Sequence, residues 1–198
     1  VFHAEIDTGV HTLMVLAKAS ELTTCPITRF AALMHDLGKA CTSFDDLPSH
    51  PNHAEKGVQP VKTLCERLKV PNVYSELAIM CAKYHTQAHK SMKLDGASLL
   101  QLLYSLDAFR NEQRFKQFLM ACKADAYGRI LYHKKGKPKP EISYPQFEYL
   151  WDAYQAASQV NVQEIIQSGA KGADIKTKLI EKQSQVLQCY VNKINPSE

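Results

Sequence analysis

The pentapeptide His35–Lys39, with the sequence HDLGK, is the part of the chain whose residue types best suit chemistry. An imidazole nitrogen and a carboxylate oxygen on adjacent residues can ligate one metal ion if they lie at a helix end, where the backbone is less regular. These two donor types together suit borderline divalent ions such as Mn, Fe, Ni, Co or Zn. Because His35 and Asp36 do not complete a site, other segments must supply further ligands.

Four residues elsewhere in the chain could supply those ligands. Each belongs to a segment whose other side is apolar, so that each could face a shared cleft: His11, His53, His85 and Asp107. A single histidine of this kind is more often hydrogen-bonded in a core or at a surface than bound to metal. Their order along the chain therefore matters more than any one of them.

The elements that must position these residues are predicted to be helices. Apolar residues recur at i, i+3, i+4 and i+7 along nearly the whole chain, and no segment alternates as a strand does. Asp7 or Thr8 is a plausible N-cap for the first helix, and Gly38 is a plausible stop for the second. We expect helices near residues 8–17, 26–37, 52–68, 72–84, 99–106, 115–122, 146–157, 162–168 and 173–194. The fold class is therefore predicted to be all-α.

The composition is that of an ordinary globular protein. The 198 residues are 45% hydrophobic, and 24 Lys and Arg against 20 Asp and Glu give a net charge of +4. This excludes a disordered or collagen-like chain, and the charge alone does not indicate nucleic-acid binding. No apolar run approaches the roughly 20 residues that span a bilayer, and no secretory signal is present, so we expect no membrane association.

The cysteines and the first residue also carry expectations. The six cysteines are scattered without a CxxC pair, which favours reduced thiols in a cytoplasmic protein over a disulfide framework or a zinc ribbon. The chain begins with Val1 rather than Met, so we expect a piece of a longer protein.

The order of the candidate ligands resembles that of the HD superfamily of metal-dependent phosphohydrolases. The matching residues are His11, the pair His35–Asp36 within HDLGK, and Asp107. The resemblance implies an all-α HD-domain bundle in which these four residues hold a divalent metal. His53 and His85 match the positions at which binuclear members add ligands, or at which mononuclear members contact substrate phosphate.

A longer series of segments narrows the resemblance. It comprises EIDTGVHT (5–12), MHDLGK (34–39), His85 with His89, SLDAFR (105–110) and ADAYGR (124–129). The series is similar to the C-terminal half of the bacterial multifunctional CCA-adding enzymes, which are tRNA nucleotidyltransferases. Similarity implies hydrolysis of 2′,3′-cyclic nucleotides, 2′-nucleotides and phosphate esters, with nickel as the favoured metal for phosphatase activity and Mn, Co or Mg as alternatives. The nucleotide-adding head of that family has a sheet and a glycine-serine signature, neither of which occurs here, so we do not expect this chain to add CCA.

The resemblance assigns roles to individual residues. The expected metal ligands are His11, His35, Asp36, Asp107 and His53. Lys39 is expected to stabilise phosphate charge, with a solvated lysine as the alternative, and His85 is expected to shuttle protons. Arg129 could grip phosphate, but its spacing from Asp125 favours an i, i+4 ion pair.

The remaining expectations concern organisation and partners. We place the HD domain at residues 1–128 and a C-terminal helical extension at 129–198. The expected partners are the tRNA 3′ end, through the parent protein, small phosphate esters, and a second copy in a homodimer. The basic segment with Lys134, Lys135, Lys137 and Lys139 could touch the tRNA backbone or simply be solvated. Two other functions stay open: a tRNA-docking or dimerisation module with a vestigial site, and another kind of HD hydrolase, which the flanking matches disfavour.

Overall fold

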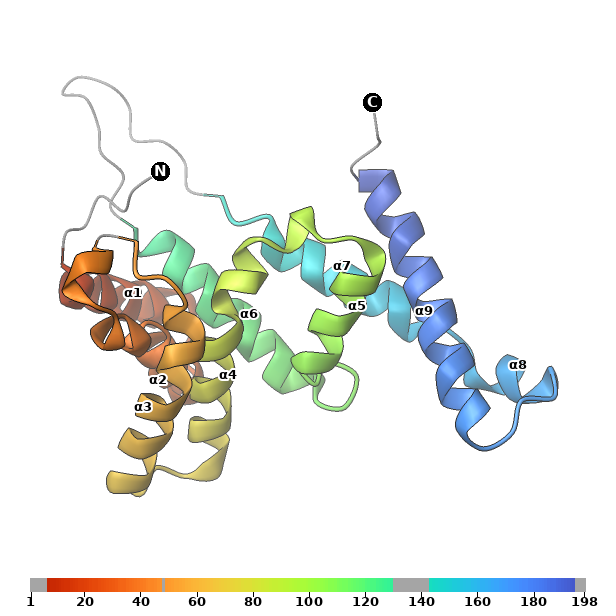
Figure 1. Cartoon of the computed structure of the whole chain (residues 1–198), viewed down its shortest axis with the longest axis horizontal. Coiled ribbons are helices and arrows are strands. Elements are labelled where there is room, and N and C mark those ends of the chain that lie inside the picture. The colour runs from red at the N-terminus through yellow and green to blue at the C-terminus, as the bar shows by residue number, and fades with distance from the viewer. Residues whose placement is uncertain (1–6, 48, 130–142, 195–198) are drawn as a thin grey trace. The chain divides into compact units, whose positions relative to one another are not determined.

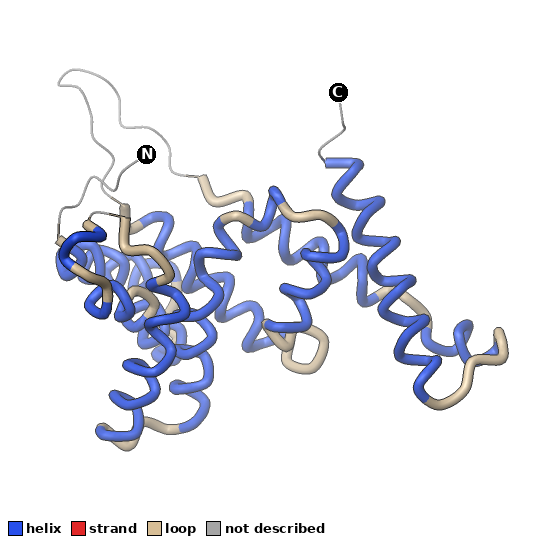
Figure 2. Tube along the Cα trace, in the orientation of Figure 1, coloured by secondary structure: helices blue, strands red, loops and turns tan. Residues whose placement is uncertain are grey.

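The computed structural model of the chain describes residues 7–47, 49–129 and 143–194. Every regular element within these ranges is a helix, and loops join the helices (Figure 2). The predicted all-α fold is therefore confirmed. The expectation for the lysines of residues 134–139 lies outside the described residues.

The chain packs into two compact units. Unit 1 consists of Val1–Ala88 and Lys116–Phe147, and unit 2 of His89–Phe115 and Glu148–Glu198. These packing units differ from a division of the chain at residue 128, and that domain boundary stays a prediction.

Unit 1 contains the segments in which the sequence predicts the metal ligands. Its helices are α1 (Thr8–Leu22), α2 (Pro26–Met34), η1 (Leu37–Cys41), η2 (Phe44–Asp46), α3 (His53–Arg67), α4 (Asn72–His89) and most of α6 (Glu112–Tyr127) (Figure 1). Helix α1 packs on α2, and α3 packs on η1. Asp7 caps α1 as predicted, because its carboxylate accepts hydrogen bonds from the backbone N–H groups of Gly9 and Val10.

The core of unit 1 is built from the apolar faces of these helices. Its fully buried side chains include Val15, Val61, Leu77 and Leu119. Three of the cysteines also lie in this core, where a free thiol packs as a small hydrophobic group: Cys65, Cys81 and Cys122. All six cysteines are free, in keeping with the prediction of reduced thiols.

Unit 2 holds η3 (Ser91–Lys93), α5 (Gly96–Ser105), most of α7 (Gln146–Ser158), α8 (Val162–Gln167) and α9 (Ala173–Ile194). Helix α9 packs on α5 and buries Gln183 and Leu187. The Tyr104 hydroxyl donates to Oε1 of Gln183 over 2.7 Å, which ties α5 to α9. The amphipathic pattern of residues 173–194 is thus satisfied at least in part within the chain itself.

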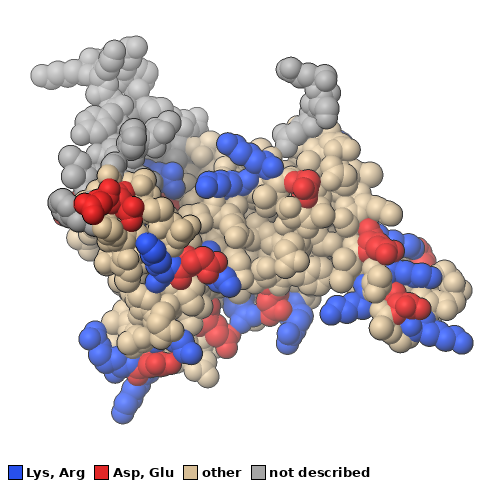
Figure 3. Space-filling model, viewed as in Figure 1, with Lys and Arg blue, Asp and Glu red and all other residues tan. Residues whose placement is uncertain are grey.

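The described helices and the face drawn in Figure 3 bear on membrane and nucleic-acid binding. None of the described helices combines the length and the apolar composition that crossing a bilayer requires. On the face shown in Figure 3, lysines and arginines are interspersed with aspartates and glutamates. The described part of this face therefore carries no continuous basic patch of the kind that nucleic-acid binding favours.

Candidate metal centre

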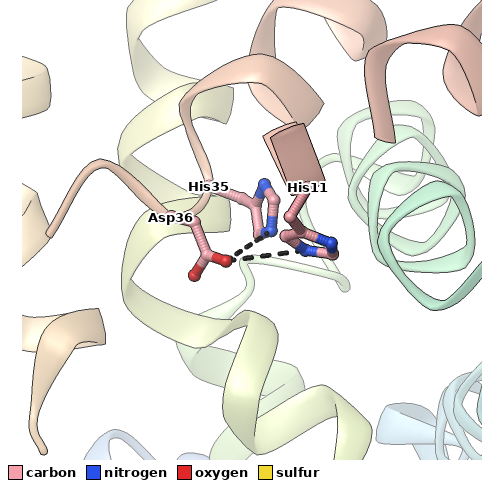
Figure 4. A group of neighbouring side chains, drawn as sticks. All are labelled: His11, His35 and Asp36. Atoms are coloured by element: carbon pink, nitrogen blue, oxygen red, sulfur yellow. Dashed lines mark ion pairs between the residues drawn. The ribbon is translucent and has the colours of Figure 1, made fainter. Parts of the chain in front are cut away.

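Three of the predicted ligands come together inside unit 1. His11 lies on α1, while His35 and Asp36 directly follow α2. Figure 4 shows both rings beside the Asp36 carboxylate. Oδ2 of Asp36 lies 3.6 Å from Nε2 of His11 and 3.2 Å from Nε2 of His35. All three residues are buried. The structure therefore places the adjacent His and Asp of HDLGK beside a histidine from another helix.

The second carboxylate of this group is Asp125, on α6. Its Oδ1 lies 3.1 Å from Nε2 of His11 and 3.6 Å from Nε2 of His35, and the residue is buried. A buried carboxylate needs partners of opposite charge or hydrogen-bond donors, and these histidines supply them. We therefore place Asp125 in the centre as its second carboxylate.

The groups of described residues that could hold an ion do not include Asp107, which the sequence analysis expected as a ligand, and that role stays a prediction. Asp107 belongs to unit 2, where it follows α5 with a left-handed backbone (φ 52°). Its carboxylate pairs closely with Arg114 and more loosely, at 3.7 Å, with Arg110. The sequence carries a weak signal for Asp125: the small residues Ala121, Cys122 and Ala124 lie close to it in the chain, and all three are buried in the structure.

A second group lies on the other side of Asp36. Nε2 of His53, at the start of α3, and Nε2 of His85, on α4, each lie 3.4 Å from Oδ1 of Asp36. The two Nε2 atoms are 3.3 Å apart. Asp36 is therefore common to two groups that could each hold an ion, one with His11 and His35 and the other with His53 and His85.

The backbone fixes the orientation of three of these rings. In each case Nδ1 donates to a carbonyl oxygen three or four residues earlier in the chain: His35 to Ala32 (2.7 Å), His53 to His50 (2.9 Å) and His85 to Cys81 (2.9 Å). Because a carbonyl only accepts, Nδ1 must carry the proton. A neutral ring then presents the Nε2 lone pair to the cluster, which is how protein metal sites prepare imidazole ligands.

Two glycines allow the helices to approach closely enough to form the centre. A Cβ on Gly38 would lie 1.9 Å from the carbonyl oxygen of His53 and 2.5 Å from the nitrogen of Gly57. A Cβ on Gly128 would lie 2.6 Å from Cγ2 of Val15, on the helix that carries His11. The prediction that Gly38 stops a helix is wrong: α2 ends at Met34, and Gly38 lies inside η1 without a positive φ. Glycine is needed there for contact with α3.

Two cations border the cluster. Nζ of Lys39 lies 2.6 Å from Oδ2 of Asp36, and the side chain is only 9% exposed, so Lys39 is not a solvated lysine. Nη2 of Arg129 lies 3.7 Å from Oδ2 of Asp125, as its i, i+4 spacing predicts, and the Arg129 side chain is 39% exposed. The Lys39 side chain therefore lies within the buried centre, whereas the Arg129 side chain is also in contact with solvent.

The ionisable groups of the centre shift one another. Burial opposes the charged form of His35, but the carboxylates of Asp36 and Asp125 outweigh it and raise the pKa of His35 well above its usual value. Burial likewise opposes ionisation of Asp36, yet His35 and His85 hold its pKa well below its usual value. Burial lowers the pKa of His53. These shifts follow from the short distances between the histidines and the carboxylates of the centre.

The arrangement fits a divalent ion better than a hydrogen-bonded network. Nε2 of His35 and Oδ1 of Asp36 are buried and have no well-aligned hydrogen bond within the described residues, although a carboxylate oxygen or a ring nitrogen lies within 3.4 Å of each. Ligand atoms that lie close together without forming aligned hydrogen bonds to one another are suited to binding a shared ion. The donor set of imidazole nitrogens and carboxylate oxygens suits borderline divalent metals.

Comparison with known proteins agrees with this geometry. The family model of the HD domain matches residues 8–157. The chain is 43% identical over 190 residues to the multifunctional CCA protein of Pseudoalteromonas atlantica, 42% over 192 residues to that of Psychromonas ingrahamii, and 40% over 192 residues to that of Vibrio parahaemolyticus.

These matches cover 96%, 97% and 97% of the chain but only 45%, 45% and 46% of the relatives. The chain therefore spans less than half the length of the curated relatives that it matches. No solved structure matches the chain significantly. The agreement of the family match with the clustered histidines and aspartates shows that the chain belongs to the HD-domain family.

Proposed function

We propose that this chain is a metal-dependent phosphohydrolase that acts on 2′,3′-cyclic nucleotides, 2′-nucleotides and simple phosphate esters. The observation that carries the proposal is the position of Asp36. Its two oxygens face two histidine pairs, His11 with His35 and His53 with His85. A site built only for structure needs no second set of ligands around the same carboxylate.

We assign His11, His35, Asp36 and Asp125 to a first ion and His53 and His85, with Asp36, to a second. A divalent ion bound there would supply acidified water and polarise a phosphoryl oxygen. The protein's part is to hold the ligands in place. The Nδ1 bonds to the backbone hold the orientation of three of the rings, and burial excludes bulk water from all the proposed ligands except His53, which is partly exposed. Nickel is our first choice of metal for phosphatase activity, followed by Mn, Co and Mg.

We propose different roles for the two cations, Lys39 and Arg129, in stabilising negative charge. Lys39 lies within ion-pair distance of Asp36, so it balances the buried carboxylates, and we propose that it also stabilises phosphate charge from that position. The Arg129 side chain is 39% exposed and lies beside Asp125, so part of its guanidinium reaches solvent. A guanidinium in this position has donors to offer an incoming phosphate.

His85 could act as a proton shuttle or as a metal ligand, and its position distinguishes between these two roles. As a proton shuttle it would need a free ring nitrogen facing a reacting group. Its Nδ1 already donates to Cys81, and its Nε2 faces Asp36 and His53. This placement favours a ligand of the second ion, and a shuttle role would require that ion to be absent.

The wider role of the protein is also a proposal. The relatives that the chain matches are named multifunctional CCA proteins, so we propose that the chain is the HD part of such a tRNA nucleotidyltransferase, which acts at the tRNA 3′ end. We propose a cytoplasmic location, in line with six free cysteines. A homodimer formed through this part of the protein remains a proposal of the same kind.

The test is a hydrolysis assay on the purified chain with 2′,3′-cyclic AMP and 2′-AMP, in the presence of Ni²⁺, Mn²⁺, Co²⁺ or Mg²⁺. We expect hydrolysis by the wild type and a loss of at least a hundredfold in Asp36→Asn. Asp107→Asn is the matched control, because it removes a carboxylate that belongs to neither candidate metal group. A wild type that binds metal but hydrolyses none of these substrates would instead favour a docking or dimerisation module.

A further inference from the structure

The segment between η1 and α3 contains a hydrogen-bonded pair, Thr42 and His50, that leads to the metal centre. Oγ1 of Thr42 lies 2.8 Å from the carbonyl oxygen of Lys39 and 2.5 Å from Nδ1 of His50. A hydroxyl has one hydrogen, and the Lys39 carbonyl can only accept it. Nδ1 of His50 must therefore donate to Oγ1, which fixes the tautomer of His50 and ties the two residues together.

His50 in turn supports a ligand. Its carbonyl oxygen accepts from Nδ1 of His53 over 2.9 Å and from the backbone N–H of His53 over 3.3 Å. The backbone that presents this carbonyl is left-handed at His50 (φ 45°) and at Asn52 (φ 58°). Such a conformation is unfavourable for a non-glycine residue and persists only where the surroundings enforce it. The bond to Thr42 is a contact that enforces it.

His53 depends on this support more than the other ligands do. Its side chain is 17% exposed, against 3–4% for those of His11, His35 and His85. Packing alone therefore constrains the His53 ring less than the other rings. The hydrogen bond to the His50 carbonyl is what directs its Nε2 toward Asp36 and His85.

We propose that Thr42 and His50 are positioning residues that aim His53 at the second half of the centre, so that occupancy of the Asp36–His53–His85 group depends on them. This inference rests on the two-ion arrangement of the proposed function. Without the Thr42 bond, His50 can relax to a negative φ, and its carbonyl oxygen then turns away from His53. The His53 ring loses the hydrogen bond that holds its orientation. The described hydrogen bonds of Thr42 and His50 go to Lys39, to each other, to Asp46 and to His53 rather than to His35 or Asp36. We therefore expect the first group of ligands to keep its geometry.

The experiment measures metal stoichiometry and affinity by calorimetric titration of the metal-free chain with Ni²⁺ and, separately, Mn²⁺. Thr42→Val removes the hydroxyl with little change of shape, while Thr42→Ser keeps it. His50→Ala removes the ring, while His50→Asn keeps an amide donor and tolerates a positive φ. We expect about two ions per wild-type chain. We expect a ten- to hundredfold weaker second ion in Thr42→Val and His50→Ala, with the first ion unchanged. Thr42→Ser and His50→Asn should recover most of the second affinity.

The outcomes separate this inference from the proposed function. Unchanged binding of two ions by folded Thr42→Val and His50→Ala would overturn the positioning role, and so would a wild type that holds a single ion. A selective loss of the second ion supports it, whether or not the protein hydrolyses phosphate esters. Loss of both ions together would also overturn it, since the Thr42–His50 hydrogen bond would then stabilise the fold as a whole rather than orient His53. Circular dichroism of each metal-free variant establishes that the chain is folded.

Discussion

Oδ1 of Asp125 lies 3.1 Å from Nε2 of His11, although the two residues are separated by 114 positions in the sequence. The contact joins α6 to α1 and brings a second carboxylate to the His35–Asp36 pair. Gly128 permits it, because any side chain there would collide with Val15 on α1. The centre therefore depends on how closely two helices far apart in the sequence can approach.

Asp125→Asn should abolish or strongly weaken metal binding at the His11–His35 group. The amide keeps the shape but removes the negative charge, so we expect at least a hundredfold loss of affinity for Ni²⁺ in calorimetry. Asp107→Asn, which alters an ion pair with Arg114 in unit 2, should leave that affinity within about twofold of the wild type. The opposite ranking of the two variants would restore Asp107 as the ligand and contradict the assignment made here.

Gly38→Ala should destabilise the protein and disturb the second half of the centre together. The new Cβ would lie 1.9 Å from the His53 carbonyl oxygen, so η1 and α3 must separate. We expect a loss of about 3 kcal/mol in the free energy of unfolding by urea denaturation. Gly57→Ala is the graded control, because its Cβ would lie 3.1 Å from the nitrogen of Gly38 and should cost less. Equal stability of Gly38→Ala and the wild type would refute this explanation of the glycine.

Lys39→Met should weaken the metal-free protein and strengthen metal binding. Removing the ammonium leaves the buried Asp36 carboxylate without its closest cation, which should lower the free energy of unfolding by about 3 kcal/mol. A divalent ion no longer competes with that cation, so the apparent affinity for Mn²⁺ should rise. If Lys39 also stabilises phosphate, kcat should fall about tenfold while metal occupancy is kept. Weaker metal binding by this variant would show that Lys39 supports the ligands rather than opposing the ion.

Tyr190→Phe should reduce the loss of folding stability at alkaline pH that arises from Tyr190 in unit 2. The Tyr190 hydroxyl donates to the backbone carbonyl of Tyr149 over 3.1 Å, and burial, followed by the charge of Asp152, raises its pKa above the usual value of 10. A raised pKa in the folded state gives stability that is present below pH 10 and is lost as the pH rises beyond it. Thermal unfolding between pH 9 and pH 11 should therefore show a steeper loss of stability for the wild type than for the variant. Parallel curves would exclude this contribution.

Arg129→Gln should weaken phosphate binding more than metal binding. Its guanidinium is partly exposed beside Asp125, so its loss should raise KM for 2′-AMP several-fold with little change in bound metal. Arg110→Gln is the matched control: this arginine also pairs with an aspartate, but its side chain is 87% exposed and lies in unit 2. A fall in metal occupancy at unchanged KM would instead make Arg129 a support for Asp125.

The sequence predicts the helices well because their signals are local. Apolar spacing, the Asp7 cap and Pro26 at the start of α2 act within one or two turns, and the helices lie close to where these signals put them. The adjacent His35 and Asp36 are likewise identifiable from local sequence. Packing contacts, in contrast, join residues that are far apart in the sequence. The need for glycine at position 38 could not be predicted from its sequence neighbours, because it arises from the close approach of α3.

The choice between Asp107 and Asp125 shows the same limit. Both follow apolar helical segments, and resemblance of order alone favoured Asp107. What separates them is tertiary: Asp107 has Arg114 as its partner, while Asp125 is buried among histidines from α1 and the end of α2. The small residues around Asp125 carried a weak signal of that burial. The role of His50 left no comparable trace, because it works through its backbone carbonyl.

Anomalous diffraction from crystals of the Ni²⁺- or Mn²⁺-loaded protein tests the central claim most directly, that Asp36 is shared by two metal positions. The account predicts one anomalous peak among His11, His35, Asp36 and Asp125, and a second between Asp36, His53 and His85. The peaks should lie on opposite sides of the Asp36 carboxylate. A peak beside Asp107, or the absence of any peak at Asp36 in metal-saturated crystals, would contradict it.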